Sequence, residues 1–245
     1  MLDQSGIIEN VNYDRYNVRS NVEGNITKDL TFELNISGFY EEKNWPGIST
    51  SAQAEQNPIQ QAVYSAPIIP IYYQGEYTAW IGPGSSTTQS PLATLRNSGF
   101  QKKQRHEFDG TMKISYAFPW VKGLSYRISY ANNWTIYNYY NFNPYGNTLL
   151  GQAEKKHTNQ NEWTLDNIIT YQNTFGKHSI DLTAVATRDR KKYEMIETTG
   201  SNFAANGNTT LGINGLHKAT VQKVNMDNNQ RSNIGYLGRA SYSYD

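Results

Sequence analysis

Apolar and polar residues alternate along several long segments of this chain. Over residues 30–40, large apolar side chains and one glycine fill every second position, and polar residues fill most of the others. Successive side chains of a β-strand point to opposite faces, so this period of two predicts a strand with one apolar and one polar face. The same pattern recurs over residues 15–26, 106–118, 124–136 and 232–244. The chain is therefore expected to be all-β.

Short turn signals join these strands in antiparallel pairs. They lie at residues 27–29, 119–123 and 175–178, and the third belongs to a hairpin over residues 163–190. Gly176 suits a tight turn, because glycine accepts the positive φ that such turns need. Together the segments predict an antiparallel up-and-down meander of about seven strands.

Long connections alternate strictly with the short turns. They are expected at about residues 44–100, 139–161 and 193–231, so all of them lie at one end of the sheet. Short turns at one end and long loops at the other are typical of bacterial outer-membrane barrels. The strands also exceed the roughly 9–11 residues needed to cross a bilayer at a tilt.

Charged residues on the polar faces favour a wet lumen over a packed core, where unpaired charges are costly. They are Arg15, Arg19, Glu23, Glu33, Asp109, Lys113 and Arg127. Seven strands would leave open edges, which a bilayer does not tolerate. The expected architecture is therefore part of a large transmembrane β-barrel.

Composition removes several other classes of protein. The 245 residues carry a net charge of +1, which gives no argument for nucleic-acid binding. There is no Cys, so disulfide scaffolds and thiolate chemistry are excluded. A mean hydropathy of −0.71 does not argue against a membrane, because a barrel alternates lipid-facing and lumen-facing residues. No signal peptide is visible at the first residues.

Three segments resemble strands of the SusC/RagA-like TonB-dependent outer-membrane transporters of Bacteroidetes. The first consists of Tyr13, Arg15, Tyr16, Arg19, Asn21 and Val22, followed by Thr27, Lys28 and Leu30. The second consists of Trp163, Thr164, Asn167, Thr170, Tyr171, Thr174, Phe175, Gly176, Lys177 and His178. The third spans residues 233–242, and residues 2–6 resemble the end of a strand that precedes the first hairpin.

The resemblance implies a plugged barrel of about 22 strands in the outer membrane of a Gram-negative bacterium. It implies energisation by TonB, a SusD-like surface lipoprotein as partner, and oligosaccharides or peptides as cargo. Residues 1–245 match barrel strands alone, so they are expected to be one barrel segment, without the plug domain and the remaining strands. The lipid and lipopolysaccharide of the membrane would be further partners.

Enzymatic and metal chemistry find no support in the residue pattern. A phosphate-binding loop needs a glycine five residues before Gly176 and a Ser or Thr after Lys177, but Tyr171 and His178 stand there. The four histidines show no zinc-like spacing. Residues 225–236 imitate the start of a calcium loop but lack its glycine and its final glutamate. We expect no catalytic residue, no metal and no cofactor.

Two sets of residues are candidates for binding. Aromatic side chains in the long connections could stack on sugars or grip peptides; they are Trp45, Tyr72, Tyr73, Trp80, Tyr139 and Tyr140. Basic residues at the long-loop ends of strands share the outward, lipid side and could pair with lipopolysaccharide phosphates; they are Lys102, Arg188, Arg190 and Lys192. Loop packing and ordinary solvated charge are the alternative interpretations.

Two other functions remain open from the sequence. A structural or adhesive outer-membrane barrel would share the strand pattern without active transport. A soluble β-rich glycan-binding module would also explain the many aromatic residues.

Overall fold

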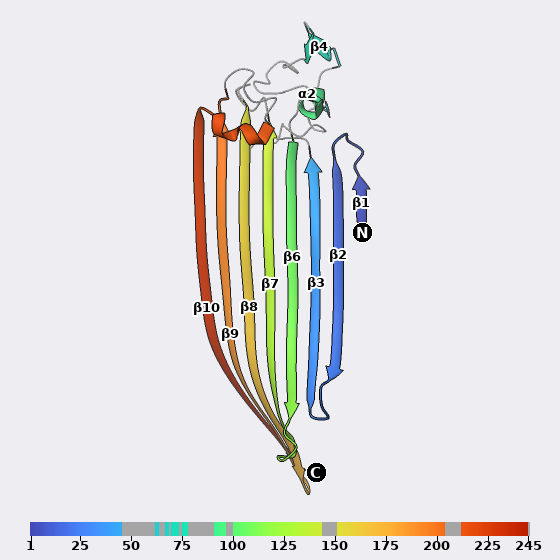
Figure 1. Ribbon diagram of the computed structural model, residues 1–245, viewed down its shortest axis with the longest axis vertical. Coiled ribbons are helices and arrows are strands. Elements are labelled where there is room, and N and C mark those ends of the chain that lie inside the picture. The colour runs from blue at the N-terminus through green and yellow to red at the C-terminus, as the bar shows by residue number, and fades with distance from the viewer. Residues whose placement is uncertain are drawn as a thin grey trace.

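One antiparallel sheet of eight strands dominates the described part of the computed structural model (Figure 1). The structure describes residues 1–45, 62–63, 67–68, 70–73, 75–77, 91–96, 100–143, 151–203 and 212–244. The sheet strands are β1 (Leu2–Ser5), β2 (Asn12–Asn25), β3 (Leu30–Trp45), β6 (Phe100–Ala117), β7 (Leu124–Asn143), β8 (Gln152–Phe175), β9 (His178–Ser201) and β10 (Val221–Tyr244). They neighbour one another in chain order, which confirms the up-and-down meander.

β1 brings the number of strands in this sheet to eight, against an expectation of about seven. Leu2 lies opposite Arg15 and Ser5 opposite Asn12 in an antiparallel pair. The interpretation of residues 2–6 as part of a strand before the first hairpin is therefore confirmed.

The turns after β2, β6 and β8 lie at one end of the sheet, and the turn after β1 lies at the other end with the longer connections (Figure 1). The β8–β9 turn has only Gly176 and Lys177 between its strands, and Gly176 has a φ of 62°. The other end carries the two-stranded sheet of β4 (Tyr72–Tyr73) and β5 (Glu76–Tyr77), the helix α2 (Pro91–Arg96) and the 3₁₀ helix η2 (Gly212–Lys218).

The strands reach further into two connections than the sequence pattern indicates. β7 ends at Asn143 and β8 begins at Gln152; β9 ends at Ser201 and β10 begins at Val221. The expected loops at 139–161 and 193–231 are therefore too long. Residues 154–161 are almost all polar, so no apolar face marks them as a strand. The backbone pairing of β8 with β7 and β9 holds them in the sheet nonetheless.

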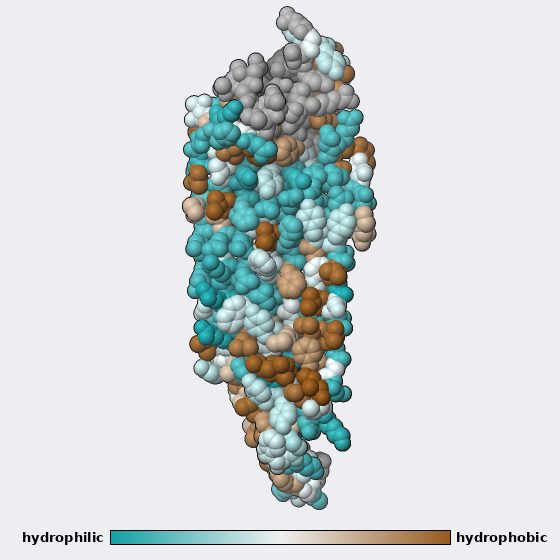
Figure 2. Space-filling view, viewed as in Figure 1, coloured by the Kyte–Doolittle hydropathy of each residue, from teal (hydrophilic) through white to brown (hydrophobic). Residues whose placement is uncertain are grey.

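Each long strand contributes to two faces that the register keeps separate. Leu34 lies opposite Val22 and Met112, and these three side chains define the apolar face. Glu33 lies opposite Glu23 and Lys113 on the other face, which we call the polar face. Hydrophobic residues gather toward the short-turn end, and hydrophilic residues dominate toward the other end (Figure 2).

A small apolar cluster closes the long-loop end on the apolar face. Phe142, Ala153, Phe203 and Ala219 are buried, and Phe100, Ile213 and Leu216 pack against them. η2 supplies Ile213 and Leu216, so this short helix covers the sheet there. Among the described residues, Met195 is the one further buried apolar side chain. The sheet therefore has no continuous hydrophobic core.

No helix among the described residues has both the length and the apolar character needed to cross a membrane.

Candidate functional site: the polar face and its charged hollows

Charged residues on the polar face neutralise one another across neighbouring strands. The Lys113 ammonium lies 2.8 Å from a Glu33 carboxylate oxygen, joining β6 to β3. The Lys191 ammonium lies 3.4 Å from Glu162, joining β9 to β8. Cross-strand neighbours sit about 5 Å apart, which allows such pairs to form. The polar face thus holds charges of both signs, some of them paired across neighbouring strands.

A first hollow of about 510 Å³ lies on this face toward the long-loop end of β1, β2, β3, β6 and β7. Its walls are Gln4, Tyr13, Glu41, Lys43, Lys103, Arg105 and Tyr137. The Tyr13 hydroxyl donates to Glu41 at 3.0 Å. Phe39 lies beneath two guanidinium groups, with Arg15 at 4.4 Å and Arg105 at 5.3 Å from its ring centroid. The ring thus holds both cations in place.

A second hollow of about 540 Å³ lies further along the same face, over β8, β9 and β10. Its walls are Glu162, Lys191, Tyr193, Asp227, Asn229 and Arg231. Both hollows therefore offer carboxylates, cations and tyrosine hydroxyls. Such walls can bind groups of either charge as well as hydrogen-bonding backbone amides.

A pair of carboxyl groups lies beyond these hollows at the long-loop end. Burial raises the pKa of Glu154 above its usual range, and the hydrogen bond and negative charge of Glu197 raise it further. Lys156 acts in the opposite direction; its ammonium lies 3.9 Å from Glu197. Glu154 can therefore remain protonated at a pH at which an ordinary glutamate is ionised.

The structure divides the predicted aromatic residues between the two faces. Tyr139 lies on the polar face, where Gln101 donates to its hydroxyl at 2.9 Å and the Lys103 ammonium lies 5.6 Å from its ring centroid. Trp45 is opposite Gln101 on the same face. Tyr140 lies on the apolar face, with the Lys155 ammonium 5.5 Å from its ring. Only Trp45 and Tyr139 of these three can belong to one site.

Two of the remaining aromatic candidates lie in a separate small sheet. Tyr72 and Tyr73 form β4 and are both more than half exposed. Trp80 lies outside the described residues. Sequence reasoning also missed the charged residues of the two hollows. The signal in the sequence that could have identified them is a charged residue at every second position near the long-loop ends of the strands.

Lys102 and the basic residues of β9 share the apolar face but differ in their surroundings. Lys102 pairs with Glu42 at 2.7 Å, so its charge is neutralised within the sheet. Arg188, Arg190 and Lys192 follow one another at every second position of β9. Lys102 lies on β6, where it is opposite Tyr140 of β7, and Tyr140 is in turn opposite Lys155 of β8. Lys102 is therefore three strands away from the basic residues of β9.

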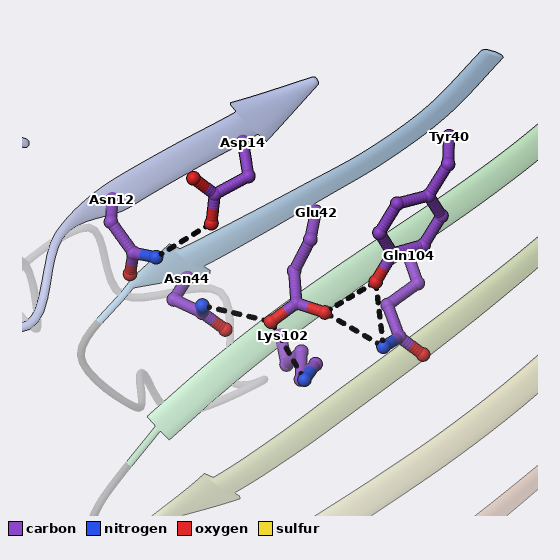
Figure 3. Close-up of polar contacts among 7 residues, drawn as sticks. All are labelled: Asn12, Asp14, Tyr40, Glu42, Asn44, Lys102 and Gln104. Atoms are coloured by element: carbon purple, nitrogen blue, oxygen red, sulfur yellow. Dashed lines mark hydrogen bonds and ion pairs between the residues drawn. The ribbon is translucent and has the colours of Figure 1, made fainter. Parts of the chain in front are cut away.

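Glu42 is the centre of a polar network on the apolar face (Figure 3). Besides Lys102, it accepts hydrogen bonds from the Tyr40 hydroxyl at 2.5 Å, from Gln104 at 2.8 Å and from Asn44 at 3.2 Å. Burial alone would raise the pKa of Glu42, but these hydrogen bonds outweigh it and lower the pKa to about 2.

The polar run that starts at Glu42 marks the border of an apolar band on this face. Large apolar side chains lie on the short-turn side of the border. Polar residues begin at Glu42 on β3, Asn138 on β7, Asn161 on β8, Arg188 on β9 and Ser232 on β10. Aromatic rings flank the band. Tyr16 stacks on Tyr40 at 6.3 Å near this border, and Tyr116 contacts Phe118 at 5.0 Å near the short turns.

No metal site is formed in the described part of the chain, where no three His, Asp or Glu side chains are placed to hold an ion.

The chain is similar to parts of longer proteins. No family model matches the chain. It is 24% identical over 252 residues to TonB-dependent receptor P3 of Formosa agariphila, covering 98% of this chain and 24% of that protein. The chain thus spans about a quarter of the length of the curated relative that it matches.

Solved structures share the same fold. A structure of the RagAB peptide transporter matches 96% of this chain with a TM-score of 0.64 and 16% identity. Structures of the RagAB peptide importer in the closed-closed and open-open states match with TM-scores of 0.69 and 0.68, at 17% and 15% identity. In each case the aligned part is 26–27% of the other chain.

These relatives are named as receptors and transporters, which agrees with the interpretation that the chain is not an enzyme. The comparisons confirm the resemblance to the SusC/RagA-like TonB-dependent transporters that the strand motifs predict, and they show that the antiparallel meander is a fold this chain shares with them.

Proposed function

We propose that residues 1–245 form part of the wall of an outer-membrane β-barrel that imports peptides. The apolar face contacts lipid, and the polar face lines the lumen through which the cargo passes. The short turns lie in the periplasm and the longer connections at the cell surface. The import is energised through TonB, and a SusD-like lipoprotein covers the surface end.

The slope of the apolar band is the observation that carries this proposal. Ser232, where the polar run begins on β10, is in register with Ile36 on β3, six residues from Glu42. The border therefore shifts by roughly 20 Å along the strand direction, which is the length of six residues. It does so across roughly 24 Å, which is the width of the five strand spacings from β3 to β10. This corresponds to a strand tilt of about 40°, within the range of about 35–45° found in transmembrane barrels.

The hollows of the polar face favour peptides over neutral oligosaccharides as cargo. Glu41, Lys43, Lys103 and Arg105 line one hollow, and Glu162, Lys191, Asp227 and Arg231 line the other. Charges of both signs suit a chain that carries charged side chains and termini, because each pairing is a charge-assisted hydrogen bond. The named transporters of this fold include peptide importers, which supports the same choice.

Uptake by the complete protein in its own bacterium tests the proposal. Labelled oligopeptides and oligosaccharides of matched size are offered to wild-type cells, to cells without the gene, and to wild-type cells with a proton-motive-force uncoupler. We expect peptide uptake to be lost in both of the latter conditions. Peptide uptake that persists without the gene or after uncoupling would contradict active import. Selective loss of oligosaccharide uptake would contradict the choice of cargo.

Capture of the complete protein under mild detergent tests the partner. A surface lipoprotein should be retained with it in stoichiometric amount. If no lipoprotein is retained with protein captured from cells that import peptides, the proposed lid is contradicted.

A further inference from the structure

A row of cations on β9 lies against the border of the apolar band. Arg188, Arg190 and Lys192 occupy alternate positions and so share the apolar face. Arg188 is opposite Leu165 on β8 and Ile234 on β10, both part of the band. The row therefore begins among apolar side chains and extends roughly 13 Å away from them.

The two arginines of this row have no carboxylate partner among the described residues. Arg190 donates to the amide oxygen of Gln230 at 2.7 Å, and its Nε is buried without a hydrogen-bond partner. The Arg188 guanidinium lies 5.9 Å from the Trp163 ring centroid. Lys192, in contrast, pairs with Glu194 at 2.7 Å.

Several other cations of the sheet, in contrast, lie close to a carboxylate. Lys102 on the same face is paired with Glu42, and Lys113 and Lys191 on the polar face are paired with Glu33 and Glu162. An unpaired guanidinium at the edge of an apolar surface is costly unless an anion meets it there. Two guanidiniums two residues apart can together surround one phosphate with bidentate hydrogen bonds.

We propose that Arg188 and Arg190 bind a phosphate group of lipopolysaccharide in the outer leaflet. The acyl chains of the same molecule lie against Leu165 and Ile234, which flank Arg188, and against the apolar band on the short-turn side of them. Trp163, held beneath Arg188, forms the boundary between the two parts of the ligand. This inference rests on the placement of the apolar face in the outer membrane under the proposed function.

The test uses the complete protein, extracted from outer membranes, as wild type and as the R188Q/R190Q variant. A matched control, K191Q/R231Q, removes two cations from the polar face of β9 and β10. Binding is titrated with lipopolysaccharide, with dephosphorylated lipopolysaccharide and with phosphatidylglycerol vesicles. Loss of two charge-assisted contacts should weaken lipopolysaccharide binding by about tenfold or more in R188Q/R190Q. The control should stay within about twofold of wild type.

Dephosphorylated lipopolysaccharide should bind the wild type as weakly as the intact glycolipid binds R188Q/R190Q. Equal loss in both variants, or no loss in R188Q/R190Q, would overturn the site. Phosphatidylglycerol binding as tight as that of lipopolysaccharide would overturn the choice of ligand. Membrane fractionation separates the two proposals: a protein absent from the outer-membrane fraction contradicts the proposed function, whereas a correctly located protein with unchanged binding contradicts this inference alone.

Discussion

Gly123 ends the turn between β6 and β7 at a position that admits no side chain. Its φ is 87°, and a Cβ built on it would lie 1.9 Å from the carbonyl oxygen of Gln172 on β8. The same backbone approach allows the Gln172 amide to donate to the Gly123 carbonyl at 2.8 Å.

G123A should therefore lower the free energy of unfolding of the complete protein by at least about 2 kcal/mol, through backbone strain and a lost hydrogen bond. G24A is the matched control, since a Cβ there meets no atom within 4 Å. Denaturant midpoints in detergent measure both. Equal midpoints for the two variants would show that the β6–β7 turn does not constrain β8.

Glu42 is expected to make the stability of the sheet sensitive to acid. Its pKa is lowered to about 2 in the folded chain, against an ordinary value of 4.5. The stabilisation from its ionised form is thus fully present above pH 4.5 and is lost as the pH falls from 4.5 toward 2. E42Q should remove this part of the acid dependence. Unfolding curves of wild type and E42Q that stay parallel between pH 6 and pH 3 would contradict the prediction.

Tyr139 and Tyr140 provide a test of which face meets the cargo. They are adjacent in sequence, but Tyr139 lies on the polar face and Tyr140 on the apolar face. Y139A should weaken peptide binding by about 1 kcal/mol, the scale of one ring contact, while Y140A should leave it unchanged. Peptide affinity of the complete protein is the measurement. A larger loss in Y140A would reverse the assignment of the faces.

At the scale of elements, alternation predicted the strands but not where they end. Leu34, Ile36 and Tyr40 alternate with polar residues, so one face of β3 is apolar. Beyond the border at Glu42 and Asn161, most side chains on both faces are polar, so the sequence there reads as a loop although backbone pairing continues. η2 was not predicted at all, because its seven residues show no helical periodicity and it is fixed by contacts with the sheet.

The attachment of η2 to the sheet depends on Phe142. This side chain is fully buried in the cluster that Ile213 and Leu216 cover. F142A should cost about 3 kcal/mol locally, since it removes a large buried ring and leaves a cavity. Amide hydrogen exchange of residues 212–218 should accelerate as a result. F175A is the control, because Phe175 is 52% exposed at the opposite end. Unchanged exchange in F142A would show that η2 is held by other contacts.

At the scale of the whole molecule, the division into two faces was predictable and the binding surfaces were only partly so. The charged positions that suggested a wet lumen, such as Glu33 and Lys113, do face one another across strands. The aromatic candidates were chosen by their place in expected loops. Tyr139 and Tyr140 instead lie on a strand, where consecutive side chains point to opposite faces of the sheet. The pairing of Lys102 with Glu42 joins strands that are far apart in sequence. Such ion pairs could not be predicted from the local sequence pattern.

The central claim is that the apolar face contacts lipid and the polar face contacts water. The chain contains no Cys, so single cysteines can be placed at Glu33, Leu34, Asn35 and Ile36 of β3 in the complete protein without other thiols in this segment. Each is labelled with a small fluorophore and the protein is reconstituted in bilayers. Quenching by acyl-chain-brominated lipids should be strong at positions 34 and 36, and quenching by aqueous iodide should be strong at 33 and 35. Uniform quenching along the strand, or the opposite alternation, would contradict the account.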